Sequence, residues 1–347
     1  MTSLERVGAW LQGIRQEIQH HRDRFRVFDT LYVGGGTPTV LPASDLQVLF
    51  DTLRNSFRFS PDVEITVEAN PDDVTIEKLK FLRDLGVNRI SLGVQSFDDR
   101  ALQFLGRRHS ARQAEQALAR ARRVGFVNVG VDLMYGLPGQ SEQEWLEQLE
   151  HAVGFTPEHF SCYQLTLEAD TPLGRMLRDG TLPSLSEESE RSLFLRTSQF
   201  MEDHGYVHYE ISNFARGEQY CSRHNRKYWQ HIPYLGLGPA AHSFFDHTRW
   251  WNMRSVDEYC RALLIDGRPP IAESEELSAE QLRLETLFLG FRTCEGVDLQ
   301  WLNVDPTAQM VGTRLVDEGL ARIDHGRMRP TREGMVIADS LPLWFCE

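Results

Sequence analysis

The sequence lacks the cysteine spacing that marks a local metal site. Among 347 residues there are five cysteines, an odd number, and none of them forms a Cys-x-x-Cys pair. A disulfide framework and a zinc or iron–sulfur site built from neighbouring cysteines are therefore not predicted. We expect isolated, reduced thiols at Cys162, Cys221, Cys260, Cys294 and Cys346.

Long apolar runs and an excess of positive charge are also missing. No run approaches the ~18 apolar residues of a membrane span, and the opening Met-Thr-Ser-Leu-Glu-Arg does not read as a signal peptide. The formal net charge of −13 disfavours non-specific binding to nucleic acid or to an anionic membrane. These absences predict a cytoplasmic protein that binds no nucleic acid and reaches a membrane only through its partners.

Three consecutive glycines stand at the end of an apolar run. The run predicts a buried strand over residues 30–33, and glycines at its end would let a ligand approach bare backbone N–H and C=O groups. No Gly-Lys-Ser/Thr follows, so this is not a phosphate loop. A simple tight turn between strand and helix remains the alternative for the segment Gly34-Gly35-Gly36-Thr37-Pro38-Thr39.

Strands and helices alternate about every 30 residues through the first two thirds of the chain, which predicts βα units and a parallel sheet. Six strands are visible, fewer than the eight of a closed barrel. We therefore predict an α/β fold with a partial (β/α) barrel; an open doubly wound sheet is the alternative. The predicted strands cover residues 30–33, 64–68, 89–94, 126–134, 159–167 and 206–210, and capping boxes at Ser44–Gln47, Ser110–Gln113 and Ser141–Glu144 predict helix starts.

An amphipathic helix is predicted over residues 3–22. Its apolar stripe should pack on a sheet, yet no strand precedes it in this sequence. We expect such a barrel to leave the stripe and a sheet edge exposed. The stripe consists of Leu4, Val7, Leu11, Ile14 and Ile18.

The sequence changes character at about residue 217, where aromatics, histidines and glycines cluster. We divide the chain into a barrel (1–215), a His/aromatic-rich connecting region (216–270) and a C-terminal module (271–347). In the module, apolar-periodic helices at 278–291 and 313–318, a hairpin over 320–329 and a short final helix suggest a winged-helix-like fold. Residues 272–347 contain seven Arg, no Lys and 14 Asp plus Glu, so packing or protein binding is expected there rather than DNA binding.

Polar residues gather at successive predicted strand ends, which share one rim in a parallel barrel. Glu68 could hold an ammonium group, Arg107 a carboxylate, and Gln95 or Asp132 ribose hydroxyls. Each residue alone also has a structural explanation: Glu68 could cap a turn, Gln95 could brace a loop, and Arg107 could be a solvated surface charge. Together with Gly35, Gly36 and Thr37 they predict a site for a zwitterionic, hydroxyl-bearing ligand.

The same segments carry a resemblance to a known family. They are similar to radical S-adenosylmethionine proteins related to oxygen-independent coproporphyrinogen III oxidase, and within that group they resemble the HemW heme-chaperone branch. The segments are Gly-Gly-Gly-Thr-Pro-Thr, Val-Glu-Ala-Asn-Pro, Leu-Gly-Val-Gln-Ser-Phe, Leu-Gly-Arg-Arg-His, Val-Asp-Leu-Met-Tyr-Gly-Leu-Pro-Gly-Gln, Cys-Ser-Arg-His-Asn-Arg-Lys-Tyr-Trp and Tyr-Leu-Gly-Leu-Gly-Pro-Ala-Ala-His-Ser.

The resemblance implies a radical SAM-type partial barrel with a C-terminal HemN-type domain. It implies heme as cargo, heme-accepting proteins such as those of respiration as partners, and His224 as the candidate heme ligand. Cys221 and His242 are alternative ligands, and a hydrogen-bonded core histidine is the structural reading of His224. The alternative function is the oxidase itself, an enzyme of porphyrin biosynthesis. A third possibility is a remnant without the cluster, which folds or regulates but has no catalytic activity. By resemblance, S-adenosylmethionine would contact Gly35, Gly36, Thr37, Glu68, Gln95, Arg107 and Asp132.

One departure from the family concerns its [4Fe–4S] cluster. Family members carry Cys-x-x-x-Cys-x-x-Cys on a first strand, and this sequence opens at the helix that would follow it. The cluster is thus expected of the family while its ligands are missing here. We expect either a misassigned translation start or a genuine short form, and the unpaired apolar stripe favours the first.

Overall fold

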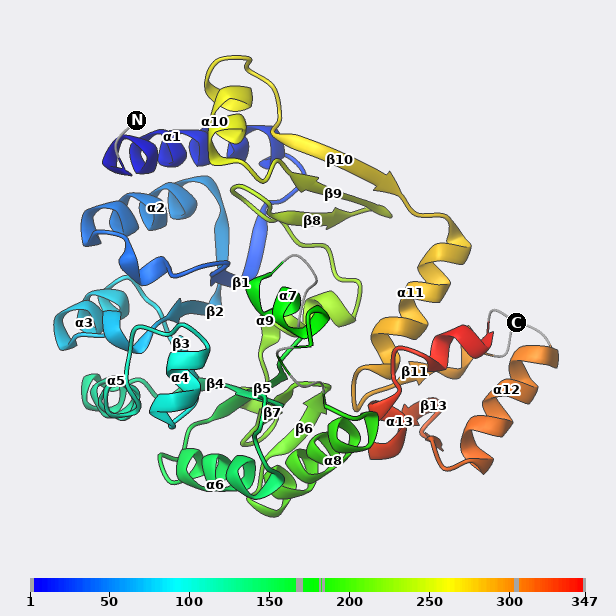
Figure 1. The fold of residues 1–347 in the computed structure, drawn as a ribbon. Coiled ribbons are helices and arrows are strands. Elements are labelled where there is room, and N and C mark those ends of the chain that lie inside the picture. The colour runs from blue at the N-terminus through cyan, green and yellow to red at the C-terminus, as the bar shows by residue number, and fades with distance from the viewer. Residues whose placement is uncertain (1–2, 167–170, 181, 183–184, 303–305, 346–347) are drawn as a thin grey trace.

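A curved sheet of seven strands forms the barrel part of the molecule (Figure 1). The computed structural model describes residues 3–166, 171–180, 182, 185–302 and 306–345. The first five strands run parallel, whereas β7 is antiparallel to both of its neighbours, β5 and β6. In spatial order the strands are β1 (Val27–Val33), β2 (Arg58–Ala69), β3 (Arg89–Gln95), β4 (Val129–Tyr135), β5 (His159–Gln164), β7 (Asn213–Ala215) and β6 (Val207–Glu210).

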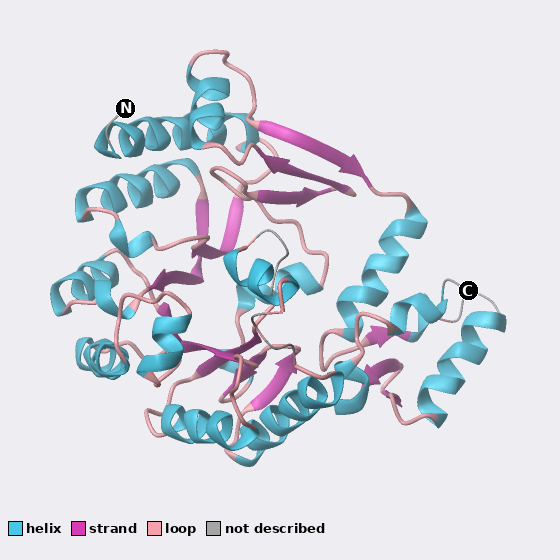
Figure 2. Ribbon diagram, viewed as in Figure 1, coloured by secondary structure: helices cyan, strands magenta, loops and turns pink. Residues whose placement is uncertain are grey.

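Helices cover the convex side of this sheet, as Figure 2 shows by the cyan ring around the magenta strands. The partial barrel is therefore confirmed, and the doubly wound alternative, which needs helices on both faces, is wrong. The outer helices are α2 (Ala43–Ser56), α3 (Ile76–Asp84), α5 (Ala111–Val124), α6 (Glu142–Val153) and α8 (Glu187–Asp203); the shorter α4 (Asp99–Phe104), α7 (Pro172–Arg178), η1 (Pro38–Val40) and η2 (Pro71–Asp73) lie in connections.

Alternation along each strand separates an apolar outer face from a polar inner one. Ile65 and Val67 of β2, for example, join the core formed with the outer helices. Between them, Thr66 and Glu68 point to the opposite, concave side, because successive strand residues face opposite ways. The inside of the barrel is thus lined by polar groups rather than filled by apolar ones.

Two of the three predicted capping boxes are present. Ser110 and Ser141 each accept the backbone N–H of the residue three positions on, and Gln113 and Glu144 close the reciprocal contact. The box predicted at Ser44 is wrong. Helix α2 begins one residue earlier, with Pro42 as the N-cap and no side-chain cap, so the Ser44 side chain lies within the first turn.

Helix α1 (Ser3–His21) forms as predicted, but its stripe is not left bare. Ile14 and Ile18 are buried in a core shared with α2 and with α10 (Val256–Leu264). The expectation of an exposed stripe is therefore wrong for these two residues, because a distant segment folds back over α1 (Figure 1). Nearby, the buried Glu17 carboxylate accepts hydrogen bonds from the Tyr259 hydroxyl (2.6 Å), the Gly238 N–H (2.9 Å) and the Asn252 amide.

The covering segment contains a three-stranded antiparallel sheet that local sequence patterns did not reveal. It follows η3 (Glu218–Tyr220) and α9 (Arg223–Trp229), which we call the motif helix because it contains Arg-His-Asn-Arg-Lys-Tyr-Trp of the segment that resembles the heme chaperones. Its strands are β8 (His242–Phe245), β9 (Thr248–Asn252) and β10 (Ile271–Glu276).

The C-terminal module combines helices with a small sheet, as predicted. Its hairpin turns at His325 and Gly326, both with positive φ. The elements are α11 (Ala279–Phe291), β11 (Val297–Asp298), η4 (Leu299–Trp301), α12 (Pro306–Asp317), β12 (Ala321–Asp324), β13 (Arg327–Pro330), α13 (Arg332–Val336) and η5 (Leu341–Phe345). Within the described part of the chain, no helix has the length and apolarity needed to cross a membrane.

Candidate functional site

The carboxylate of Glu68 is the centre of the rim where the parallel strands end. Its Oε1 accepts the Tyr32 hydroxyl at 2.7 Å, and its Oε2 accepts the Gly35 N–H at 3.2 Å. Glu68 lies at the end of β2 and Tyr32 on the adjacent β1, whose register pairs Tyr32 with Thr66. The glycine segment and Glu68 are therefore joined directly, as the shared-rim prediction requires.

A second set of contacts runs along the rim through Asn70. The Asn70 amide donates to Thr37 Oγ1 at 2.9 Å, and its Oδ1 accepts Arg107 Nη2 at 2.7 Å. Arg107 Nη2 also donates to the Gly93 carbonyl at 2.9 Å. Sequence reasoning missed Asn70, although an Asn-Pro directly after a strand is a signal for a polar side chain fixed at a strand end.

Gln95 ends β3 in a conformation that is unusual for its type. Its φ is +66°, and the β3–β4 register shifts between Leu92 and Gln95. The Gln95 amide lies 3.2 Å from where a Cβ on Gly93 would stand, beside Arg107. Non-glycine residues held in the left-handed region are uncommon and cluster at functional sites, so the turn that aims Gln95 at the rim is consistent with a binding role.

The three consecutive glycines have different roles. A Cβ on Gly34 would stand 2.5 Å from the Tyr32 ring and 2.6 Å from the Glu68 carboxylate, so this position has no room for a side chain. Cβ atoms on Gly35 or Gly36 would meet nothing within 4 Å. Gly34 therefore serves packing, while Gly35 and Gly36 present open backbone to the space above the rim.

Asp132 is bonded to a neighbouring strand rather than to the other predicted residues. It is on β4, and its carboxylate accepts the Ser91 hydroxyl at 3.1 Å. Burial inside the barrel raises the pKa of Asp132 to about 6, and the nearby Glu68 charge acts in the same direction. The structure thus places Asp132 on β4 beside Ser91 of β3, two residues beyond Gly130, the register partner of Ser91.

His224, on α9, lies against the concave face of β1, where the side chains of Thr30 and Tyr32 stand. Its Nδ1 lies 3.0 Å from Thr30 Oγ1, its Nε2 lies 2.8 Å from the Tyr228 hydroxyl, and its ring stacks on Tyr32 with centroids 4.9 Å apart. Its backbone N–H donates to Glu64 Oε1 at 3.1 Å. Burial lowers the pKa of His224 to about 4, with the Lys227 charge acting in the same direction, so the imidazole is neutral at pH 7.

A cavity of about 750 Å³ lies between α1, the end of β1 and α9. We call it the β1-side cavity. It is lined mainly by apolar side chains, with the backbone of residues 34–37 on one wall and His224 and Tyr228 on another. His242 also reaches it and stacks on Trp251 (centroids 5.7 Å apart). The predicted heme ligand therefore shares this cavity with Gly35, Gly36 and Thr37 of the predicted rim, while Glu68, Gln95, Arg107 and Asp132 lie outside its lining.

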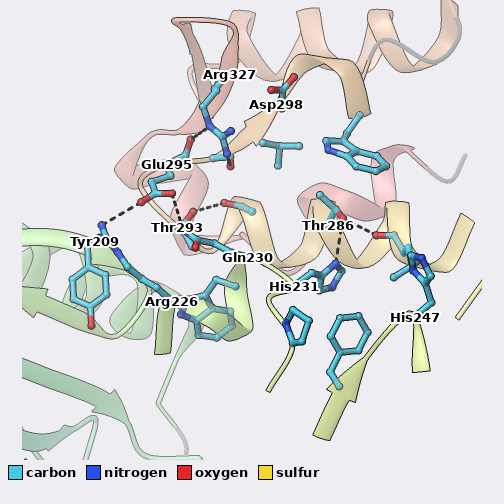
Figure 3. A pocket seen from close by; sticks show the side chains of 18 of the residues that line it. Tyr209, Arg226, Gln230, His231, His247, Thr286, Thr293, Glu295, Asp298 and Arg327 are labelled. Carbon is cyan, nitrogen blue, oxygen red and sulfur yellow. Dashed lines mark hydrogen bonds and ion pairs between the residues drawn. The ribbon is translucent and has the colours of Figure 1, made fainter. Parts of the chain in front are cut away.

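Another cavity, of about 610 Å³, lies on the other side of α9, and we call it the junction cavity. Figure 3 shows that side chains of α9, of α11 and of the loop after α11 converge on it. An ion pair joins Arg226 to Glu295 at 3.2 Å, and His231 Nε2 lies 3.3 Å from the Glu285 carboxylate. Burial lowers the pKa of His231. The motif helix thus turns His224 and Tyr228 to one cavity and Trp229 to the other.

The cysteines do not form a ligand set. Cys162, Cys221 and Cys260 are buried in three different cores, and burial raises the pKa of the Cys221 thiol to about 12. Cys346 lies outside the described residues. No group of three His, Cys, Asp or Glu in the described ranges could hold a metal ion, so these residues do not fit an iron–sulfur cluster. The rim does fit S-adenosylmethionine, since it offers a carboxylate, a guanidinium and open backbone.

Comparisons with known proteins agree with this geometry. Residues 11–152 match the Radical SAM superfamily, and residues 277–337 match the HemN C-terminal domain. The chain is 34% identical to "Heme chaperone HemW" of Bacillus subtilis over 90% of this chain and 84% of that protein. It is 35% identical to the mitochondrial "Radical S-adenosyl methionine domain-containing protein 1" of Bos taurus over 92% of this chain and 75% of that protein.

A solved structure shares the fold over nearly the whole chain. Coproporphyrinogen III oxidase (HemN) from Escherichia coli superposes with a TM-score of 0.83 at 23% identity, covering 99% of this chain and 84% of that one. The fold and rim define a radical SAM-type half-barrel protein with a HemN C-terminal domain. Within that superfamily, the chain belongs to the family of the HemW heme chaperones.

Proposed function

We propose that this chain binds heme through His224 and delivers it to acceptor proteins, and that its rim binds S-adenosylmethionine. The observation that carries the proposal is a neutral imidazole, fixed in position on the wall of a largely apolar cavity. Apolar walls suit a porphyrin face, and a neutral imidazole is the form that ligates iron. The relatives named as heme chaperones support the same assignment.

The contacts of His224 support one tautomer for ligation. With the proton on Nδ1, the ring donates to Thr30 Oγ1, and Nε2 accepts the Tyr228 hydroxyl. Metal-bound histidines commonly donate their other N–H to a fixed acceptor. Iron would take the place of the Tyr228 hydroxyl at Nε2, so Tyr228 has to rotate away when heme binds. This exchange makes ligation reversible, as a protein that gives up its cargo requires.

At the rim, Glu68 would take the ammonium group of S-adenosylmethionine and Arg107 its carboxylate. Gly35 and Gly36 would contact the ligand through their backbone, while Thr37, Gln95 and Asp132 would supply further polar contacts. S-adenosylmethionine supplies radical chemistry only together with a reduced cluster. None of the heme contacts above depends on that chemistry, and no contact among the described residues favours the oxidase alternative.

The test is a hemin titration followed by the Soret band. The wild-type chain should give a saturating shift, and His224→Ala should weaken binding by about tenfold or more, because it removes the axial ligand. His231→Ala, a matched change in the junction cavity, should leave the titration unchanged. No saturable shift in the wild-type chain, or equal binding by His224→Ala, would contradict heme binding at this site.

Delivery needs a second measurement. Hemin-loaded protein is mixed with apomyoglobin, whose holo spectrum is distinct, and the rate of transfer is followed. We expect complete transfer, with a faster rate from a Tyr228→Trp variant, in which a larger side chain crowds the exchanged position. Hemin that stays bound in the presence of excess acceptor would support storage rather than delivery.

A further inference from the structure

Tyr32 contacts both halves of the proposed site. Its hydroxyl donates to Glu68 Oε1 at 2.7 Å, and its ring lies against the His224 imidazole at 4.9 Å with an interplanar angle of 20°. One rigid side chain thus spans from the cofactor rim to the candidate heme ligand. Nothing in the rim or heme assignments above gives Tyr32 a role.

We propose that Tyr32 is a positioning residue, which couples the occupation of the Glu68 carboxylate by a ligand to the orientation of the His224 ring. S-adenosylmethionine and heme would then alter each other's affinity. This inference rests on the proposed function, because it concerns heme binding at His224. It adds the physical link between the two sites. Such coupling is reciprocal by thermodynamic necessity.

The chemistry at Glu68 gives the first step. Both carboxylate oxygens are occupied, one by Tyr32 and one by the Gly35 N–H. A ligand ammonium group that binds Glu68 has to share or displace these donors. Burial, and then the charges of Glu68 and Asp132, raise the pKa of Tyr32 well above its usual value. Tyr32 therefore keeps its proton and responds by moving rather than by ionising.

Close packing gives the second step, because it limits where Tyr32 can move. Gly34 leaves no room beside the ring and the carboxylate, as the 2.5 Å and 2.6 Å approaches of a hypothetical Cβ show. On the other side, His224 is held at Nδ1 and at its backbone N–H, two contacts that do not involve the Nε2 atom proposed to bind iron. A shift of the Tyr32 ring therefore has to change the plane or the contacts of the imidazole. The imidazole plane in turn affects its bond to iron.

A double-mutant cycle on hemin affinity tests the link. Glu68→Ala removes the acceptor of the Tyr32 hydroxyl, and Tyr32→Phe removes the hydroxyl but keeps the stacked ring. We expect Glu68→Ala to change the hemin Kd by about three- to tenfold in the wild-type background and by less than about twofold in the Tyr32→Phe background. Tyr135→Phe, which removes a hydroxyl from a strand residue packed on Trp145, should leave the full Glu68→Ala response.

Equal responses in the Tyr32→Phe and wild-type backgrounds, or no response in either, would overturn the link. If the Tyr32 hydroxyl only supported the fold, Tyr32→Phe would by itself weaken hemin binding. We expect instead that Tyr32→Phe binds hemin with the affinity of the wild-type chain. Glu68→Gln keeps an acceptor oxygen and should behave nearly as wild type. If the wild-type chain binds no hemin, the proposed function fails; if it binds hemin through His224 without this pattern, only the link fails.

A spectroscopic measurement gives a test that does not need Glu68→Ala to fold. The electron paramagnetic resonance of bound ferric heme depends on the orientation of its imidazole ligand. Tyr32→Leu removes the stacked ring and should shift the g values, while Tyr32→Phe should leave them unchanged. Identical spectra for the three proteins would contradict a positioning role.

Discussion

The β1-side cavity and the junction cavity are both lined by helix α9, but their histidines differ in how firmly they are held. His224 is fixed by two ring hydrogen bonds and a stacked tyrosine, beside open glycine backbone and apolar walls. His231 has looser contacts, 3.5 Å to Thr286 and 3.3 Å to Glu285, in a cavity crossed by ion pairs (Figure 3). An aromatic, histidine-bearing cavity is therefore not enough to identify a cargo site. The contacts that orient the imidazole distinguish the two.

The largest expected effect comes from adding a methyl group at Gly34, on the wall of the β1-side cavity. Gly34→Ala should lower the free energy of unfolding by about 1–3 kcal/mol, because the new methyl group meets Tyr32 and Glu68. Gly36→Ala is the matched control, since its Cβ meets nothing within 4 Å; its effect should be under about 0.5 kcal/mol. Urea denaturation measures both. Equal losses would show that Gly34 is not the packing constraint.

The second prediction concerns the partner of His224 Nδ1. Thr30→Val keeps the shape and removes the hydroxyl, so hemin affinity should fall by about tenfold, as for other residues that orient a metal ligand. Thr286→Val makes the same change beside His231 and should leave hemin affinity unaltered. A loss from Thr286→Val matching that from Thr30→Val would remove the distinction between the two cavities.

The third prediction uses pH. A histidine ligates iron only when neutral, and the pKa of His224 is lowered to about 4 by burial. Hemin affinity should therefore stay constant from pH 8 to about 5 and fall as the pH approaches 4. An ordinary exposed histidine would lose half its affinity near pH 6.5. A midpoint near 6.5 in the titration series would contradict ligation by His224.

The smallest effect is expected in the junction cavity. Arg226→Ala removes ion pairs to Glu218 and Glu295, both of which are substantially exposed. Surface ion pairs contribute little, so the free energy of unfolding should fall by about 0.5–1 kcal/mol while hemin affinity stays the same. Thermal unfolding and the Soret titration measure the two quantities. A loss of hemin affinity here would extend the cargo site across α9.

The sequence was informative wherever local pattern and strand order determine position. Successive strand ends predicted that Gly35, Thr37, Glu68 and Arg107 would share a rim, and the hydrogen bonds of Gly35 and Asn70 join them. The contact of Asp132 with Ser91 was not predictable, because it depends on the register of β3 and β4. The roles of the predicted binding residues themselves stay predictions.

Contacts between distant segments were the hardest to foresee. Asn70 joins Thr37 to Arg107, which lie 33 and 37 positions from it in the sequence. Tyr32 stacks on His224 of α9, almost two hundred residues later. The β8–β10 sheet was missed because its strands are short and lie among glycines and aromatics. The capping box at Ser44 failed for a local reason, since Pro42 already fixes the start of α2.

Helix α1 also has a consequence for how the protein is made. Glu17 is bonded to Asn252 and Tyr259, which follow it by 235 and 242 residues. At about 5–20 residues per second, a ribosome needs roughly 10–50 s to add that length of chain. Until then, Ile14 and Ile18 cannot reach their partners on α10 and are free to associate with other chains. The packing of α1 is thus completed late in synthesis. The yield of folded protein in the cell should therefore depend on how well the apolar residues of α1 are protected from other chains during that interval.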